Sequence, residues 1–176
     1  MNDIKEYIKN LNTEDIPWNR MVTAYGTAEN YPELLEVLDG MKDLDKVKKA
    51  WNEISDFEHQ STLFAPAPFV LVFLVRILEK AKNTDNPVAV WLVNELDKSF
   101  EYYLEICEYA ENSEHAEPLP NFSDMLDEEY LSPEGLTEDD LEEYLEEYDE
   151  NFMSDENYFY SLYYYSKKVI SGAWRE

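Results

Sequence analysis

One segment of the chain is apolar on every side. It runs from Pro66 to Leu78, and its only charged residue is Arg76. A helix that is hydrophobic all round belongs in the interior of a protein, because none of its faces gains by contact with water. Pro66 and Pro68 stand at its start, where a helix tolerates proline. The segment therefore predicts a central helix against which the segments on both sides pack.

The alternative is a buried strand, because residues 69–75 are rich in β-branched and aromatic side chains and periodicity alone does not separate the two. The helix is favoured because no other segment alternates as a partner strand would. Most other segments carry apolar residues at helical spacing. The clearest are 4–11, 32–41, 47–54, 87–110, 137–148 and 154–169, with a shorter one at 122–130.

These segments predict eight or nine helices and no strand, hence an all-α protein. Short helices joined by tight turns favour an α-α superhelix of antiparallel helix pairs around the buried central helix, although no repeat has a fixed period. Several ends are marked in the sequence. Asn86 is expected to cap the longest helix, 137–140 has the form of a capping box, Ser154 is expected to cap the last helix, and Gly26 is expected to end a helical segment.

The length of 176 residues suits a single domain, 1–176. Cys107 is the only cysteine, so no intramolecular disulfide is possible, and its place on an apolar stripe predicts a buried thiol. The first residues lack the pattern of a signal peptide, and the apolar run is shorter than the roughly 20 residues that cross a bilayer. We expect a cytoplasmic protein that is not inserted in a membrane.

Charge is distributed very unevenly along this chain. The formal net charge is −26; residues 1–98 carry 11 basic and 17 acidic side chains, whereas residues 99–176 carry 3 and 23. No Lys or Arg occurs from Ser99 to Ser166. Such a balance disfavours nucleic acid and anionic membranes as partners and favours a basic protein. The acidity has two interpretations, a surface that only keeps the protein soluble and a functional acidic face. The functional face is favoured, because the self-repulsion of the acidic residues destabilises the fold unless a partner relieves it.

The sequence predicts no catalytic residue, no metal site and no cofactor. Its two histidines, His59 and His115, have no cysteine partners and no Glu three residues before them, which disfavours zinc and di-metal sites. Asp149 to Asn157 lacks the glycine of an EF-hand loop. We interpret His59 and Gln60 as residues that hydrogen-bond the connector and cap the central helix. An enzyme would need a pocket that gathers His59 with carboxylates.

A block of short motifs resembles a known family. The motifs are Pro17-Trp18, Ala24-Tyr25-Gly26, Pro32-Glu-Leu-Leu, Trp51-Asn-Glu-Ile and His59-Gln-Ser-Thr, followed by Ala67-Pro-Phe and an apolar helix. Together they cover about a third of the chain and are similar to small bacterial HEAT-repeat-like proteins. The resemblance implies an α-α superhelical fold for residues 1–98, and some members of that family are thought to act as immunity proteins beside secreted toxins. It brings no catalytic residues, and residues 99–176 match no known pattern.

Resemblance and charge both favour an inhibitor that neutralises a basic, nuclease-like toxin through an acidic surface. We predict that Glu142, Glu143, Glu146 and Glu147 bind this partner, with Tyr163 and Tyr164 as aromatic anchors. The tyrosine-rich end allows a second interpretation, in which it forms a wide core helix between two others. The alternative function is a helical adaptor that binds another cellular protein without any toxin.

Overall fold

The apolar segment forms helix α4, Ala67–Lys82, in the computed structural model of the chain. Every residue from Ala67 to Leu74 is buried, and the exposed positions come only near the end of the helix. Pro66 is the N-cap, and Pro68 lies in the first turn, where its missing N–H has no partner to lose. The prediction of a central helix is confirmed, and the alternative of a buried strand is wrong.

The structure describes residues 3–110, 116–152 and 155–175, with the side chains of 149–152 left out. The other α-helices are α1 Ile4–Asn10, α2 Tyr31–Gly40, α3 Leu44–Ile54, α5 Pro87–Ala110, α6 Glu138–Phe152 and α7 Glu156–Ser171. Short 3-10 helices are η1 Thr13–Asp15, η2 Trp18–Arg20, η3 Ser55–Phe57, η4 Phe122–Leu126, η5 Glu128–Tyr130 and η6 Ala173–Arg175. Two strands, β1 Glu58–His59 and β2 Thr62–Leu63, form a hairpin. The protein is therefore mostly helical, as predicted.

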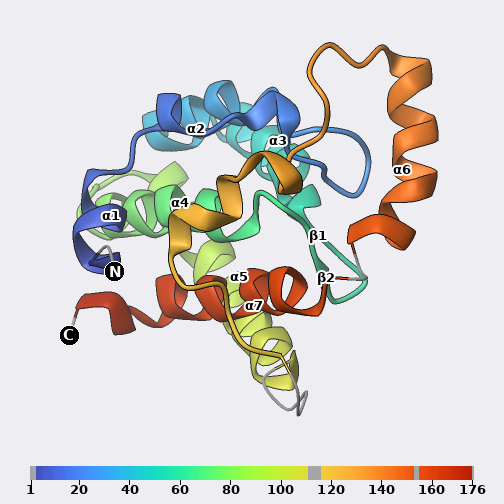
Figure 1. Cartoon of the computed structure of the whole chain (residues 1–176). Helices are drawn as coiled ribbons and strands as arrows, with labels where there is room; N and C mark the ends of the chain where they lie inside the picture. The colour runs from blue at the N-terminus through green and yellow to red at the C-terminus, as the bar shows by residue number, and fades with distance from the viewer. Residues whose placement is uncertain (1–2, 111–115, 153–154, 176) are drawn as a thin grey trace.

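Helices from both halves of the chain cover α4 (Figure 1). α2, α5 and α7 pack against α4, and α7 also packs against α5. α1 contacts η4 and also contacts η6, which lies near the C-terminal end of the chain. One hydrophobic core contains residues from Ile8 to Val169. In an α-solenoid each repeat contacts chiefly its neighbours, whereas here the last helix returns to the central one. The superhelical arrangement therefore stays a prediction, while the all-α class is confirmed.

Several predicted helix starts are confirmed by hydrogen bonds. The Asn86 side chain accepts from the amide of Ala89 at 2.8 Å at the start of α5. At the start of α6, the Thr137 hydroxyl accepts from the amide of Asp140 at 3.2 Å, and the Asp140 carboxylate accepts from the amide of Thr137 at 3.1 Å. This is the reciprocal pattern of a capping box. Ser154 lies outside the described residues, and Asp155 caps α7.

The helix expected at Met21–Gly26 is absent. Val22 pairs with Thr27 in an isolated antiparallel bridge, so this segment is a tight loop. The cause is tertiary, because the hydroxyl of Thr23 donates to the Asp56 carboxylate at 2.7 Å and the amide of Ala24 donates to the Asp56 carbonyl at 3.0 Å. Contacts with a residue more than thirty positions away thus outweigh the local helical pattern.

The expected connector after α3 is a two-stranded hairpin, so the prediction of no strand is wrong here. Glu58 pairs with Leu63, and Gln60 and Ser61 at the turn have φ of 50° and 66°. Two successive residues with positive φ match the twist of a tight hairpin. The Glu58 side chain supports this turn by accepting from the amide of Ser61 at 2.8 Å. The expected capping of α4 by His59 and Gln60 is also wrong, because its N-cap Pro66 has no side-chain cap.

Arg76, the one charge of the apolar stretch, contacts the end of α1. Its Nη1 donates to the carbonyl of Leu11 at 2.8 Å, and its Nη2 donates to those of Ile8 at 2.6 Å and Lys9 at 3.4 Å. The last carbonyls of a helix lack partners within the helix, and a cation suits the negative end of the helix dipole. Burial lowers the pKa of the Arg76 guanidinium, yet arginine stays charged in proteins. The charge therefore joins α1 to α4.

The substitution Arg76→Met keeps an apolar stem and removes the donors. We expect the free energy of unfolding to fall by about 2 kcal/mol, because partly buried carbonyls lose hydrogen bonds from a charged group. Urea denaturation measures the change. The control Lys82→Met breaks only an exposed ion pair with Asp97 and should cost less than about 1 kcal/mol. Equal losses in the two variants would contradict the capping role.

Candidate functional site

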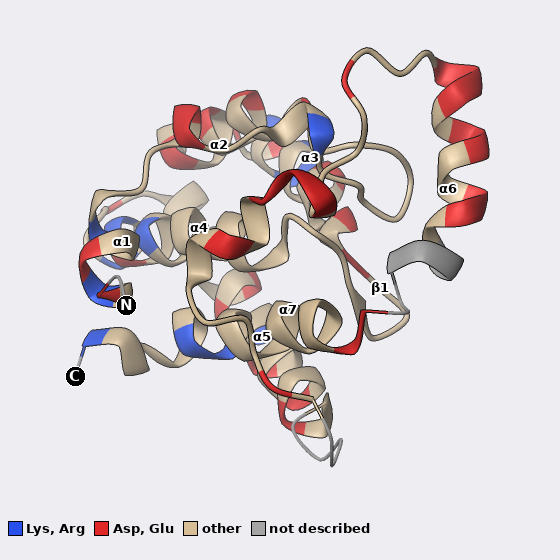
Figure 2. Ribbon diagram, viewed as in Figure 1, with Lys and Arg blue, Asp and Glu red and all other residues tan. Residues whose placement is uncertain are grey.

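The four predicted glutamates, Glu142, Glu143, Glu146 and Glu147, are all exposed on α6. The opposite side of α6 carries Leu141, Tyr144 and Leu145, which are half-buried, and Tyr148, which is buried. The Tyr148 ring stacks on that of Phe64 with the centroids 6.3 Å apart. Figure 2 shows α6 standing at the edge of the molecule with acidic residues along it. None of the four glutamates forms an ion pair with any residue that the structure describes.

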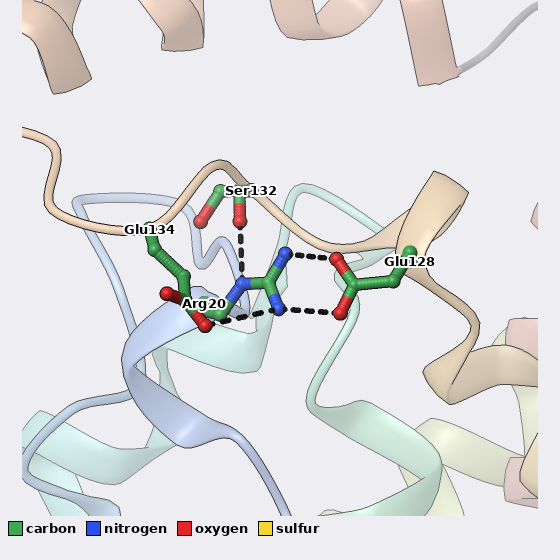
Figure 3. A network of polar contacts seen from close by, with 4 residues as sticks. All are labelled: Arg20, Glu128, Ser132 and Glu134. Carbon is green, nitrogen blue, oxygen red and sulfur yellow. Dashed lines mark hydrogen bonds and ion pairs between the residues drawn. The ribbon is translucent and has the colours of Figure 1, made fainter.

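Arg20 fixes the acidic loop that leads into α6 (Figure 3). Its Nη1 and Nη2 donate to the two oxygens of Glu128 at 2.9 and 2.6 Å, and its Nε donates to the carbonyl of Ser132 at 2.8 Å. Glu134 adds a longer ion pair at 3.8 Å. The bond with Arg20 lowers the pKa of the Glu128 carboxyl and raises that of the Arg20 guanidinium. A fork of this kind fixes geometry as well as charge.

The two predicted aromatic anchors differ in position. Tyr163 is buried, with 4% of its surface exposed, so its expected role as a surface anchor is wrong. Its hydroxyl accepts from the amide of Leu63 at 3.2 Å and donates to the carbonyl of Ser61 at 3.3 Å, which ties the hairpin to α7. Tyr164 is half-buried, and the ammonium of Lys168 lies 5.0 Å from its ring centre. The interpretation of α7 as a wide core helix holds for Tyr163.

A large cleft lies elsewhere in the described part of the chain and has a volume of about 810 Å³. It is bounded by the 25–27 loop, the start of α2, the end of α3, the hairpin and α5. Its walls include the carboxylates of Glu53, Asp56 and Glu58, the imidazole of His59, and five aromatic side chains, Tyr25, Tyr31, Trp51, Tyr102 and Tyr103. Among the residues that the structure describes, no Lys or Arg lines it. A pocket that gathers His59 with carboxylates, which an enzyme would need, is thus present.

Asp56 holds the floor of this cleft together. Its Oδ1 accepts from the hydroxyl of Tyr31 at 2.5 Å, and its Oδ2 accepts from that of Thr23 at 2.7 Å. Burial raises the pKa of Asp56, and these two hydrogen bonds lower it in part. Burial and the adjacent carboxylate raise the pKa of Tyr31 well above its ordinary value, so its hydroxyl stays a donor. Both oxygens of Asp56 are therefore occupied by the fold.

Glu58 and His59 lie at the rim, each beside a tyrosine. The hydroxyl of Tyr102 donates to Glu58 Oε1 at 3.2 Å, and the hydroxyl of Tyr25 lies 3.1 Å from His59 Nδ1. Tyr25 and Tyr102 are 74% and 43% exposed. The sequence analysis did not predict that Tyr25 and Tyr102 are exposed aromatic residues. For Tyr102 a signal existed, because it falls between the apolar positions of the stripe along α5.

No family model, curated protein or solved structure matches this chain. Within the described residues, no three His, Cys, Asp or Glu side chains are grouped as a metal ion would require. His115 lies outside the described residues. None of the described helices combines the length and the apolar character needed to span a bilayer.

The pH dependence of stability tests the environment of Asp56. The pKa of Asp56 in the folded state is raised above its ordinary value of 3.8. At a pH between 3.8 and the pKa of the folded state, the folded state therefore binds more protons than the unfolded state. The stability contributed by Asp56 therefore increases as pH falls through this window and is lost as pH rises through the folded pKa. The residue in Asp56→Asn does not titrate. We expect the stability of the wild type, relative to Asp56→Asn, to increase as pH falls from neutrality toward 3.8. Urea denaturation of both proteins across this range measures the difference, and a constant difference would contradict the raised pKa.

A second substitution tests the hairpin clamp, the pair of hydrogen bonds by which the Tyr163 hydroxyl attaches the hairpin to α7. Tyr163→Phe removes a hydroxyl that bonds the turn and the second strand of the hairpin, and we expect the free energy of unfolding to fall by about 1 kcal/mol. Tyr164→Phe is the matched control, because its hydroxyl has no hydrogen bond to the described residues and its loss should change stability little. Amide hydrogen exchange at Leu63 should accelerate in the first variant alone. Unchanged exchange there would show that the clamp is unimportant.

Proposed function

We propose that the protein is a non-enzymatic inhibitor that binds a basic protein partner through the acidic face of α6. The observation that carries this proposal is the exposed row Glu142, Glu143, Glu146 and Glu147, which has no cationic partner in the described part of the chain. Uncompensated like charges repel one another, and a basic partner relieves that repulsion. The position of α6 at the edge of the molecule leaves this face accessible (Figure 2).

The rigid seating of the acidic segment supports the same proposal. Arg20 holds the loop before α6, the capping box at Thr137 fixes its first turn, and Tyr148 packs its inner side against Phe64. A preorganised surface loses less conformational entropy when it binds. Tyr164, half-buried on α7, stays a candidate contact of this partner.

The partner class that suits this surface best is a nuclease-like toxin. A protein that binds nucleic acid must be basic where the phosphates lie, and a row of carboxylates competes for those positions. An immunity protein in the bacterial cytoplasm, built on a HEAT-like superhelix, is the form of the proposal that the resemblance supports. A helical adaptor would use the same surface, but its partner would keep its activity in the complex.

The inhibitor is proposed as non-enzymatic because the fold engages the acid–base groups of the cleft. Both oxygens of Asp56 accept hydrogen bonds from other side chains, and His59 Nδ1 is bonded to Tyr25. A general base needs a free lone pair within reach of the proton that it removes. Glu58 is bonded through one oxygen and keeps the other without a donor among the described residues, and Glu53 is engaged there by an ion pair with Lys49 at 3.8 Å.

Charge reversal on α6 tests the proposal. The partner is first captured from the native host at low salt, purified and assayed for activity with and without this protein. We expect Glu142→Lys with Glu146→Lys to slow association about tenfold, because electrostatic steering is lost. The control Glu101→Lys with Glu105→Lys alters two exposed glutamates at the same spacing on α5 and should slow it less.

Salt supplies the second arm of this experiment. Association should slow as the salt concentration rises, because exposed charges are screened over about 10 Å at 0.1 M salt. Binding that ignores both salt and the α6 reversals would overturn the acidic-face proposal. A partner that retains full activity in the complex would instead identify the protein as an adaptor.

A further inference from the structure

The cleft beside the hairpin has a chemistry that α6 lacks, because aromatic rings surround its carboxylates. Five aromatic side chains and three acidic ones line about 810 Å³, with no Lys or Arg among them. Tyr31, Trp51 and Tyr103 are buried and form the inner wall, while Tyr25 and Tyr102 are exposed at the rim. An aromatic face attracts a cation through its quadrupole, and a carboxylate beside it adds a full negative charge.

The three carboxylates are not equivalent. Asp56 accepts hydrogen bonds on both oxygens, and Glu53 Oε1 lies 3.8 Å from the ammonium of Lys49. Glu58 accepts two hydrogen bonds on Oε1, from the Ser61 amide and the Tyr102 hydroxyl. Its Oε2 has no donor among the residues that the structure describes. Glu58 is therefore a carboxylate held in place on one side and open on the other.

The hairpin that presents Glu58 is itself held firmly. Gln60 and Ser61 adopt positive φ at its turn, and the buried hydroxyl of Tyr163 bonds the Ser61 carbonyl in the turn and the Leu63 amide in β2. Tyr25 is positioned by its hydrogen bond with His59 of the same hairpin, and their rings meet edge to face with the centroids 5.4 Å apart. The open oxygen and the exposed rings are thus fixed before any ligand arrives.

We propose that this cleft is a binding site for an organic cation carrying a guanidinium group, with Glu58 as its anion and Tyr25 and Tyr102 as its aromatic walls. A guanidinium is planar and weakly hydrated, pairs with a carboxylate and stacks on aromatic rings, so it uses both features at once. The group can come from a free small molecule or from an arginine of a partner protein. The site is separate from α6 and does not depend on the function proposed for α6.

The probe is N-ethylguanidinium, and its uncharged isostere N-ethylurea is the reference ligand. Titration followed by the amide NMR spectrum should give saturable shifts at residues 58–61 and around Tyr102 for the cation, and no saturable shift for the urea. Glu58→Gln keeps an acceptor for Ser61 and Tyr102 and removes only the charge, so the fold is preserved. We expect it to raise the Kd for the cation about tenfold. Tyr25→Leu should raise it about threefold.

The matched control is Glu147→Gln, which makes the same change of charge on α6 and should leave this Kd unchanged. Equal weakening by Glu58→Gln and Glu147→Gln would reduce the effect to overall charge and overturn the proposal. Equal binding of the urea and the cation, or no saturable binding of the cation, would also overturn it. Because the probe does not contact α6, these outcomes leave the test of the acidic face independent.

A third ligand separates the two sources of the cation. Arginine placed within a short capped peptide is titrated beside N-ethylguanidinium. A lower Kd for the peptide assigns the cleft to an arginine of a partner protein, because the backbone then adds contacts. An equal Kd assigns it to a free small cation. Both results support a guanidinium site, and failure of both ligands to bind contradicts it.

Discussion

The burial of Ala67 to Leu74, the first half of α4, governs the arrangement of the whole chain. A helix with apolar residues on all sides must be covered on all sides, because each exposed side would cost the hydrophobic free energy of its residues. α2 and α5 cannot enclose it alone, so α7 returns from the far end of the chain to complete the cover. The acidic half is thereby joined to the same core as the first half. Residues near the two ends of the chain consequently meet, with Lys5 donating to the carbonyl of Arg175 at 2.8 Å.

The few cations near this core serve the fold. Arg76 bonds the carbonyls at the end of α1, and Arg20 holds the loop at Glu128. Other ion pairs join α4 to neighbouring elements: Lys80 with Asp39, Lys82 with Asp97 and Arg175 with Glu79. None of these cations pairs with the exposed glutamates of α6. The glutamates of α6 therefore belong to the acidic excess that has no cationic partner among the described residues.

Helices with a strong apolar pattern or a marked cap could be predicted from the sequence. The pattern of α3, the cap of α5 at Asn86 and the capping box of α6 depend on residues a few positions apart, so local reasoning finds them. The loop at Val22 and the hairpin at Glu58 could not be found in this way. Both depend on distant partners, Asp56 for the loop and Tyr163 for the hairpin, and such contacts exist only in the folded chain.

The candidate sites also differ in whether local sequence or contacts with distant residues determine them. Exposure of the α6 glutamates follows from helical spacing alone, so they could be placed from the sequence. Tyr163 could not, because only its distance from the hairpin decides that its hydroxyl is used internally. The cleft was missed for a related reason. Its lining comes from five separate segments, and the sequence around Tyr25 predicts the end of a helix where the structure has a loop.

Two acidic features of such different character would act at different ranges. The glutamates of α6 are exposed, so their field extends over about a Debye length and salt weakens it, which suits the speed of encounter. The cleft presents one open carboxylate between rings, and its attraction is short-ranged and depends on the shape of the cation. A partner that used both would be attracted by α6 and then selected at Glu58. Because α7 packs against α4 and bonds the hairpin through Tyr163, the burial of α4 also holds the hairpin that carries Glu58.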